Sequence, residues 1–185
     1  MTFFIRWIST RVLTSLTNTL RGALVDKLIL YHGTDCLFDA IDLSVSKNNR
    51  DFGRGFYTTT ISSQAESWAS SMKVRRHGEH AYVCEYEFVP CAGLKTLEFP
   101  GLTIEWLEFI KENRSLGGVQ HDYDVVMGPV ANDNTLLTVN RYIQGAYTAE
   151  EALARLAYFK ANDQVSFHTD QAISCLMLKR RYCLD

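Results

Sequence analysis

Short strand-like segments separated by helical ones, in no regular order, most constrain the fold of this 185-residue chain. Residues 28–31 (LILY) form an apolar run as long as a buried strand, and it stops at residues 32–34 (HGT). Residues 81–88 (AYVCEYEF) alternate like a strand with one buried face. Because strands and helices do not follow the regular rhythm of a parallel βαβ sheet, the pattern predicts an α+β fold.

The remaining elements follow from the same local patterns and from capping residues. Strands are expected at 56–60, 94–99, 123–130 and 164–169, and helices at 63–77, 103–115, 149–160 and 170–178. Residues 135–144 fit either a helix or a strand, with the helix favoured. Residues 28–185 are expected to form one domain, because 46% of the residues are hydrophobic and 22% are charged. A formal net charge of −2 excludes a strongly basic nucleic-acid-binding coat.

Residues 1–27 are expected to form an amphipathic helical extension, because their apolar side chains recur at helical spacing. Such a helix would dock on the domain or on a partner; a helix lying on a membrane surface is the alternative. Arg6, Arg11 and Arg21 interrupt every apolar run, so neither a membrane span nor a secretory signal is expected.

The five cysteines are widely spaced and include no C-x-x-C pair, which is typical of reduced thiols in a cytoplasmic protein. Neither a disulfide framework nor a zinc site is therefore expected. His77 and His80 are close in sequence, but no third ligand stands at a suitable spacing, so a metal site is rejected. His121 and His168 belong to no motif and are expected to be core or surface residues.

Two segments carry side chains suited to a nucleotide ligand. In residues 31–34 (YHGT), His32 at a strand end and the open backbone of Gly33 could both hydrogen-bond a ligand. In residues 51–60 (DFGRGFYTTT), Arg54 between two glycines could meet a phosphate, and the ring of Tyr57 could stack on a heteroaromatic ring. Each segment taken alone is more typical of a structural role.

Together, YHGT and DFGRGFYTTT resemble the signature segments of the ADP-ribosyltransferase superfamily. More narrowly, the chain resembles a bacterial family of uncharacterised ADP-ribosyltransferase-like domains. The resemblance covers residues 28–178 and includes EWLEFIKENR, YDVVMGPVANDNT and NDQVSFHTDQAISCL. It implies a split pair of small β-sheets around an NAD cleft, with flanking helices.

The resemblance also implies roles for individual residues. His32 would hydrogen-bond a ribose hydroxyl of NAD, the backbone of Gly33 would bind the nicotinamide amide, and Tyr57 would stack on the nicotinamide ring. The cofactor-binding set is completed by Tyr31, Thr34, Arg54, Gly55 and Phe56. The third signature residue of the superfamily is usually a glutamate, and Gln164 stands at the matching position.

This glutamine matters because cleavage of the bond between ribose and nicotinamide develops an oxocarbenium-like cation, which a carboxylate stabilises. The amide of Gln164 can orient a hydroxyl but cannot act as a base near neutral pH. Either the nucleophile needs no base, or Asp163 or Asp133 supplies one, or the protein binds NAD without turnover. With a working transferase favoured, the expected catalytic set is His32, Tyr57, Gln164 and Asp163.

The predicted function is mono-ADP-ribosyl transfer from NAD to a macromolecular acceptor, either protein or nucleic acid. Bacterial domains that this chain resembles are often toxins paired with an antitoxin protein, or effectors of phage defence. The alternatives are an NAD glycohydrolase, with water as acceptor, and a catalytically silent module that binds NAD or another nucleotide.

Overall fold

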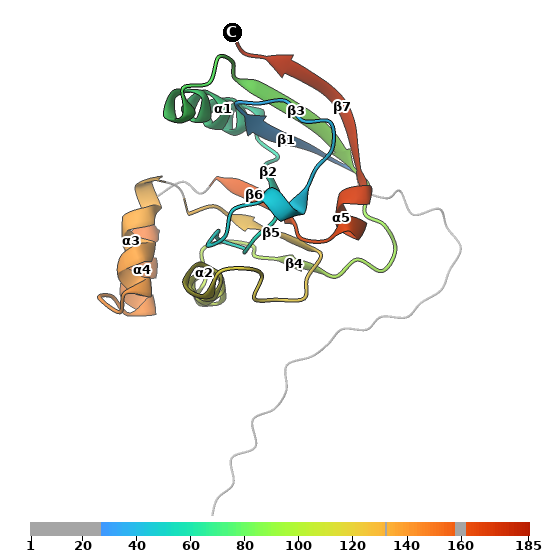
Figure 1. Ribbon diagram of the computed structural model, residues 1–185. Coiled ribbons are helices and arrows are strands. Elements are labelled where there is room, and N and C mark those ends of the chain that lie inside the picture. Colours follow the sequence, from blue (N-terminus) through green and yellow to red (C-terminus); the bar gives the residue numbers. More distant parts are fainter. Residues whose placement is uncertain (1–26, 132, 158–161) are drawn as a thin grey trace, which may run out of the picture.

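The computed structural model describes residues 27–131, 133–157 and 162–185, which form two small sheets and several helices. The first sheet has the order β1 (Leu28–Thr34), β3 (Tyr82–Phe88) and β7 (Leu176–Cys183), all antiparallel. The second has the order β2 (Phe56–Thr58), β6 (Asp163–Phe167), β5 (Val125–Pro129) and β4 (Thr96–Glu98). Only the pair of β4 and β5 is parallel. The predicted α+β class is confirmed (Figure 1).

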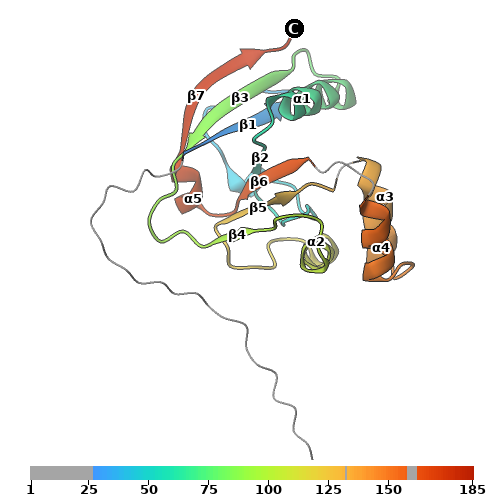
Figure 2. The ribbon, with the colours of Figure 1, turned by 180° about the vertical axis from the view of Figure 1, so that it is seen from behind.

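The helices surround the two sheets (Figure 2). They are α1 (Ser62–Arg76), α2 (Ile104–Leu116), α3 (Asp133–Ile143), α4 (Ala149–Leu156) and α5 (Asp170–Ser174), with a 3-10 turn at Leu43–Val45. Helix α1 lies against the first sheet, and α2, α3 and α4 lie beside the second. Thr103, Thr148 and Thr169 cap α2, α4 and α5 by accepting a backbone hydrogen bond, as their sequence positions predict.

Two hydrophobic clusters hold these layers together. The cluster between the sheets contains Leu30, Phe56, Tyr86, Phe88, Val165 and Phe167. The cluster between the second sheet and its helices contains Phe52, Trp106, Ile110, Val126, Val139 and Leu156. Strand β5 contributes Val125 to the first cluster and Val126 to the second, because alternate side chains of a strand point to opposite faces. The second sheet is therefore buried on both sides around the site described below.

The structure corrects two expectations from the sequence. The predicted helix at 170–178 ends at Ser174, and residues 176–183 form β7, which pairs with β3. Cys91 and Cys175 form a disulfide, so the expectation of only reduced thiols is wrong; Cys36, Cys84 and Cys183 are free. The predicted helix at 1–27 and the end of the predicted helix at 149–160 fall on positions 1–26 and 158–161, outside the described residues.

Candidate functional site

The candidate site lies where β1 and β2 separate. Tyr31 and Thr59 exchange both backbone hydrogen bonds, at 2.8 and 3.0 Å, and this is the one bridge between the two strands in the described chain. Residues of a strand send their backbone polar groups to alternate edges, so Gly33 presents its N–H and C=O to the same edge as Tyr31. Continued pairing would set Gly33 opposite Tyr57. Instead, the carbonyl oxygen of Tyr57 accepts a hydrogen bond of 2.7 Å from Nδ1 of His32.

The consequence is that the backbone of Gly33, a buried residue, is not paired with β2. No hydrogen bond joins Gly33 to β2 in the part of the chain that the structure describes. Glycine is required here for packing: a Cβ atom would lie 2.0 Å from the carbonyl oxygen of Ala65 in α1. Helix α1 therefore packs closely on the face of β1 at Gly33.

His32 is held as a neutral imidazole of defined orientation. Its ring packs on Phe56 at 4.5 Å and against the edge of Phe38 at 5.8 Å. Burial lowers the pKa of His32, and the hydrogen bond to the Tyr57 carbonyl requires the proton on Nδ1. Nε2 then carries a lone pair, and it accepts no hydrogen bond from any described residue. This atom can accept one from a ligand hydroxyl.

Tyr57 meets His32 through its backbone, whereas its ring packs elsewhere. The Tyr57 hydroxyl donates to the Gly53 carbonyl at 2.6 Å and accepts from the Phe52 amide at 3.1 Å. Its ring lies edge-on to His168 at 6.4 Å and joins the cluster under α2. Because burial raises the pKa of Tyr57, the phenol stays neutral. Tyr57 as a whole is partly buried.

Gln164 lies on β6, in a buried polar network beside Tyr57. Its Nε2 donates 3.1 Å hydrogen bonds to Oδ2 of Asp51 and to the Pro129 carbonyl. Asp51 also accepts from Arg114, at 2.5 Å to Nη2, and from the Ala131 amide at 3.0 Å. Since both partners of Nε2 are acceptors, the amide orientation is fixed. Gln164 Oε1 receives no hydrogen bond from any residue in the described ranges.

Asp163 precedes Gln164, and its carboxylate is engaged by β2. It accepts hydrogen bonds from the Thr59 and Thr60 hydroxyls and from the Thr60 amide. Asp133, the other carboxylate proposed as a base, is the first residue of α3, and its side chain lies outside the described part. Among the two candidates, the structure therefore places only Asp163 next to the β1–β2 junction.

Residues 52–54 are held by three rings, two of which the sequence did not single out for function. The Phe52 carbonyl accepts from His121 Nε2 at 2.9 Å, and the Arg54 carbonyl accepts from His168 Nδ1 at 2.9 Å. The Gly53 carbonyl accepts from Tyr57, as described above. The ring of His121 stacks on Phe109, and the His121 and His168 rings lie edge-on with their centroids 4.6 Å apart. His121 and His168 thus fix the loop that leads into β2.

The other predicted ligand residues are placed as follows. Thr34 is buried and hydrogen-bonds Cys36, whereas Tyr31 packs on the α1 side of β1. Phe56 is buried between the sheets. At Gly55, a Cβ atom would lie 2.7 Å from the Phe167 carbonyl, so packing requires glycine there. The side chain of Arg54 is exposed and forms no ion pair with a described residue.

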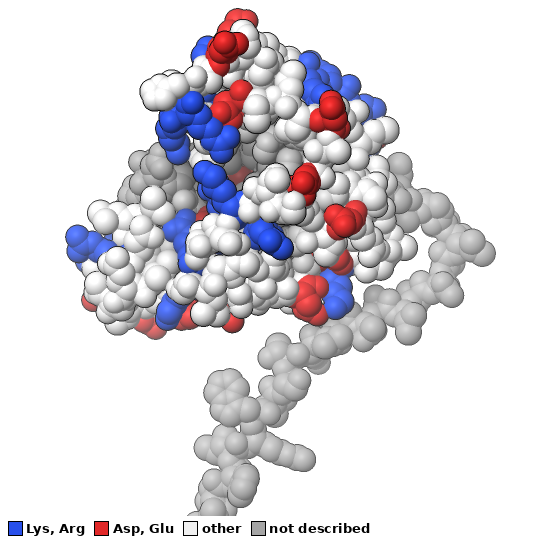
Figure 3. Space-filling model, in the orientation of Figure 1, with Lys and Arg blue, Asp and Glu red and all other residues white. Residues whose placement is uncertain are grey.

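A basic groove runs between α1 and the loop that precedes β2. Its volume is about 430 Å³, and it is lined by Lys47, Asn48, Asn49, Arg50, Trp68, Met72, Arg75 and Arg76. Four of these side chains are cationic, and no described carboxylate lines it. Trp68 is 41% exposed, with the Arg75 guanidinium 5.2 Å from its ring. Figure 3 shows a hollow with Lys and Arg side chains gathered along its edge. His32 and Tyr57 do not line this groove, although α1 is common to both places.

Comparison with known proteins gives one match. The model of a family described as "Protein of unknown function (DUF3990)" covers residues 28–178. The chain belongs to the DUF3990 family. No curated protein and no solved structure matches it. The junction residues described above, which include Tyr31, His32 and Gln164, all lie within residues 28–178, the part that the DUF3990 family model covers.

The structure also bears on the expected absence of a membrane span. Within residues 27–131, 133–157 and 162–185, no helix has the length and apolar character needed to cross a bilayer.

Proposed function

We propose that the DUF3990 chain binds NAD at the β1–β2 junction and transfers ADP-ribose to a macromolecular acceptor. The observation that carries this proposal is that the N–H and C=O of Gly33 are not paired with β2, next to a His32 ring whose Nε2 has no described partner. A carboxamide such as that of nicotinamide has one acceptor and two donor hydrogens, so it complements both backbone groups of Gly33. A ribose hydroxyl complements the neutral imidazole of His32.

Charge supports a dinucleotide as the ligand. NAD carries a pyrophosphate, and the groove along α1 offers four cationic side chains. Three of them, Lys47, Arg50 and Arg75, form no ion pair with a described residue, so binding a phosphate there breaks none. The exposed indole of Trp68 in the same groove presents a flat surface for a heteroaromatic ring. Helix α1 thus links a groove suited to phosphate with the backbone of Gly33.

In the reaction, the C–N bond between ribose and nicotinamide breaks, and nicotinamide leaves with the bonding electrons. The acceptor nucleophile then forms a bond to the same carbon and loses a proton. Gln164 Oε1 can accept a hydrogen bond from a ribose hydroxyl and hold the ring in place. Asp163, which hydrogen-bonds Thr59 and Thr60 next to the junction, is the residue proposed to accept the proton. Its carboxylate accepts hydrogen bonds from the Thr59 and Thr60 hydroxyls.

The acceptor class is tested with NAD that carries a label in its adenylate part. Purified protein, labelled NAD and a bacterial lysate are incubated, and the product is divided between nuclease and protease digestion. Transfer predicts label on macromolecules that one treatment removes and the other leaves. His32→Ala should abolish labelling, whereas His77→Asn, at an exposed position outside the site, should not. Equal labelling by wild-type protein and His32→Ala would overturn the proposal.

A second candidate follows from Gln164, which places an amide where the resemblance leads one to expect a carboxylate. If the chain binds NAD without turnover, calorimetry will show binding and no nicotinamide will be released over hours. If water is the acceptor, free ADP-ribose will accumulate while no macromolecule is labelled. If ADP-ribose is transferred to a macromolecule, we further propose that the chain acts as a toxin paired with a protein antitoxin, or as a phage-defence effector.

A further inference from the structure

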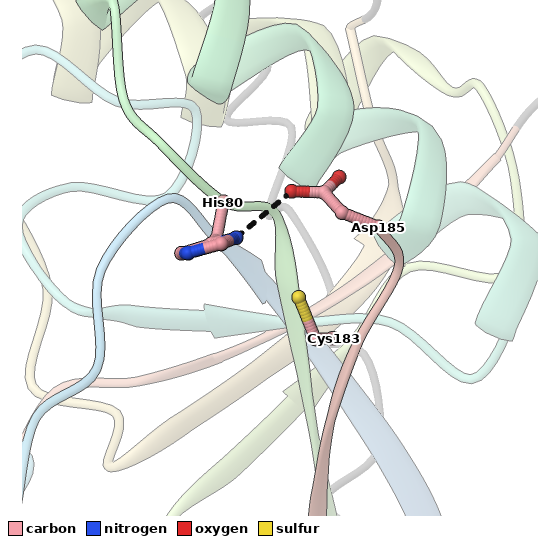
Figure 4. A group of neighbouring side chains, drawn as sticks. All are labelled: His80, Cys183 and Asp185. Atoms are coloured by element: carbon pink, nitrogen blue, oxygen red, sulfur yellow. Dashed lines mark hydrogen bonds and ion pairs between the residues drawn. The ribbon is translucent and has the colours of Figure 1, made fainter.

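We propose that His80, Cys183 and Asp185 form a binding site for a divalent transition-metal ion, with Zn²⁺ as the best match. One ligand atom from each residue lies within 4.8 Å of those of the other two. Figure 4 shows the three side chains near one another, with His80 facing Asp185. The proposal is independent of NAD binding.

The backbone fixes this convergence. Tyr82 of β3 pairs with Cys183 of β7, and the Leu184 amide donates to the Ala81 carbonyl at 2.9 Å. In an antiparallel pair, this register sets His80 directly across from Asp185. Cys183 and Asp185 are two positions apart and therefore point to the same face as His80. The site is thus a cross-strand pair with a diagonal neighbour, the closest set of side chains that a sheet provides.

The donor set determines the class of metal. A thiolate, an imidazole and a carboxylate together match Zn²⁺, which accepts sulfur, nitrogen and oxygen ligands, whereas Mg²⁺ and Ca²⁺ prefer oxygen alone. His80 Nδ1 and Asp185 Oδ2 are already 3.2 Å apart. That is close to the separation of about 3.5 Å between two ligands of one tetrahedral zinc ion. Water would complete the tetrahedron, since all three residues are exposed.

One interaction competes with the metal. Lys73 forms an ion pair of 2.7 Å with Asp185 Oδ2, and both side chains are about one-third exposed, at 33% and 32%. Exposed ion pairs contribute little to stability, so Lys73 can swing away at small cost. Lys73→Ala should therefore tighten metal binding.

Co²⁺ and Zn²⁺ are the probes. Titration of the full chain with Co²⁺ in degassed buffer should produce the absorption bands of tetrahedral cobalt bound to a thiolate. An equimolar amount of Zn²⁺ should remove those bands. Cys183→Ser should abolish the sulfur-to-cobalt band, and His80→Ala should weaken binding at least about tenfold, because each removes one of three protein ligands.

His77→Asn and Cys36→Ser are the matched controls, because they remove the same ligand types at exposed positions outside the cluster. Both should bind Co²⁺ as the wild type does. Circular dichroism checks that every variant is folded. The proposal is overturned if the wild type shows no thiolate band. It is also overturned if Cys36→Ser loses the band while Cys183→Ser keeps it.

Discussion

Gln164 Nε2 donates a 3.1 Å hydrogen bond to Oδ2 of Asp51, a residue 113 positions away in the sequence. The same nitrogen donates to the Pro129 carbonyl. Two acceptors therefore face this position, and a residue there must donate. A glutamate, the usual third signature residue of the superfamily that the chain resembles, would bring a carboxylate against the carboxylate of Asp51. The glutamine and the aspartate form one structural unit.

Gln164→Glu should therefore destabilise the protein instead of improving catalysis. Removing the donor and placing a second charge beside Asp51 should cost about 3 kcal/mol of unfolding free energy. Urea denaturation of wild type and variant at pH 7 measures this difference. The double variant Asp51→Asn/Gln164→Glu restores a donor and should be more stable than the sum of the two single changes predicts. Strict additivity would contradict this account of Gln164.

Gly33→Ala should be among the most destabilising single methyl additions in the chain. The new Cβ atom would lie 2.0 Å from the backbone oxygen of Ala65 and 2.9 Å from the amide nitrogen of Ala69, so α1 would have to move. We expect a loss of about 3 kcal/mol, measured by thermal or urea unfolding. Gly101→Ala is the control, because nothing lies within 4 Å of its Cβ position. Equal stability of the two variants would show that α1 does not pack on Gly33 as described.

Stability should rise with pH between about 4 and 6.5, in part because of His168. Burial lowers the pKa of His168 from 6.5 to about 4 in the folded protein. The unfolded chain therefore binds more protons in this interval, and stability present above pH 6.5 is lost as the pH falls toward 4. The loss from this residue is up to roughly 3 kcal/mol. The lowered pKa values of His32 and His121 act in the same direction.

His168→Gln tests this assignment, because the amide cannot titrate but can still donate to the Arg54 carbonyl. Unfolding free energies measured from pH 4 to pH 7 should show a flatter slope for this variant than for the wild type. His77→Asn should leave the slope unchanged, and asparagine tolerates the left-handed backbone at that position, where φ is 55°. An unaltered slope in His168→Gln would contradict the buried, neutral state of His168.

The Cys91–Cys175 disulfide closes a long loop, because the two cysteines are 84 positions apart in the sequence. Its loss by reduction or by Cys91→Ser should lower the unfolding free energy by about 4 kcal/mol. Urea denaturation with and without reductant measures the loss, and the reductant should have no further effect on Cys91→Ser. Cys36→Ser, which removes an exposed free thiol, serves as the control. If reductant leaves the wild type unchanged, the bridge does not stabilise the fold.

Local patterns predicted most of the elements around the site. The strand at Leu28–Thr34, the alternating strand at Tyr82–Phe88 and the capped helix α4 could be found because apolar spacing and capping are encoded within a few residues. Strand β7 could not. Its residues Lys179, Arg180 and Arg181 are charged and mostly exposed, which gives no local strand pattern. They form a strand because β3 provides backbone hydrogen-bond partners on the side away from β1.

Contacts between distant segments were beyond local patterns. Asp51 and Gln164 are each unremarkable polar residues in the sequence, and only the pairing of β2 with β6 brings them together. His121 and His168 lacked a motif for the same reason, since they bind backbone carbonyls of another segment. The motif at residues 31–34 was recognisable in the sequence. The separation of β1 from β2 was not, because it depends on a contact: the His32 imidazole, and not the Gly33 amide, donates to the Tyr57 carbonyl.

The central claim is that the β1–β2 junction binds NAD through His32 and the backbone of Gly33. Isothermal titration of NAD into the wild type and into His32→Ala, with His77→Asn as the control, tests it most directly. We predict that the wild type and the control bind NAD. The affinity of His32→Ala for NAD should be at least about tenfold lower, which corresponds to the loss of one hydrogen bond between neutral groups. Equal affinity in His32→Ala, folded by circular dichroism, or no NAD binding by the wild type, would contradict the account.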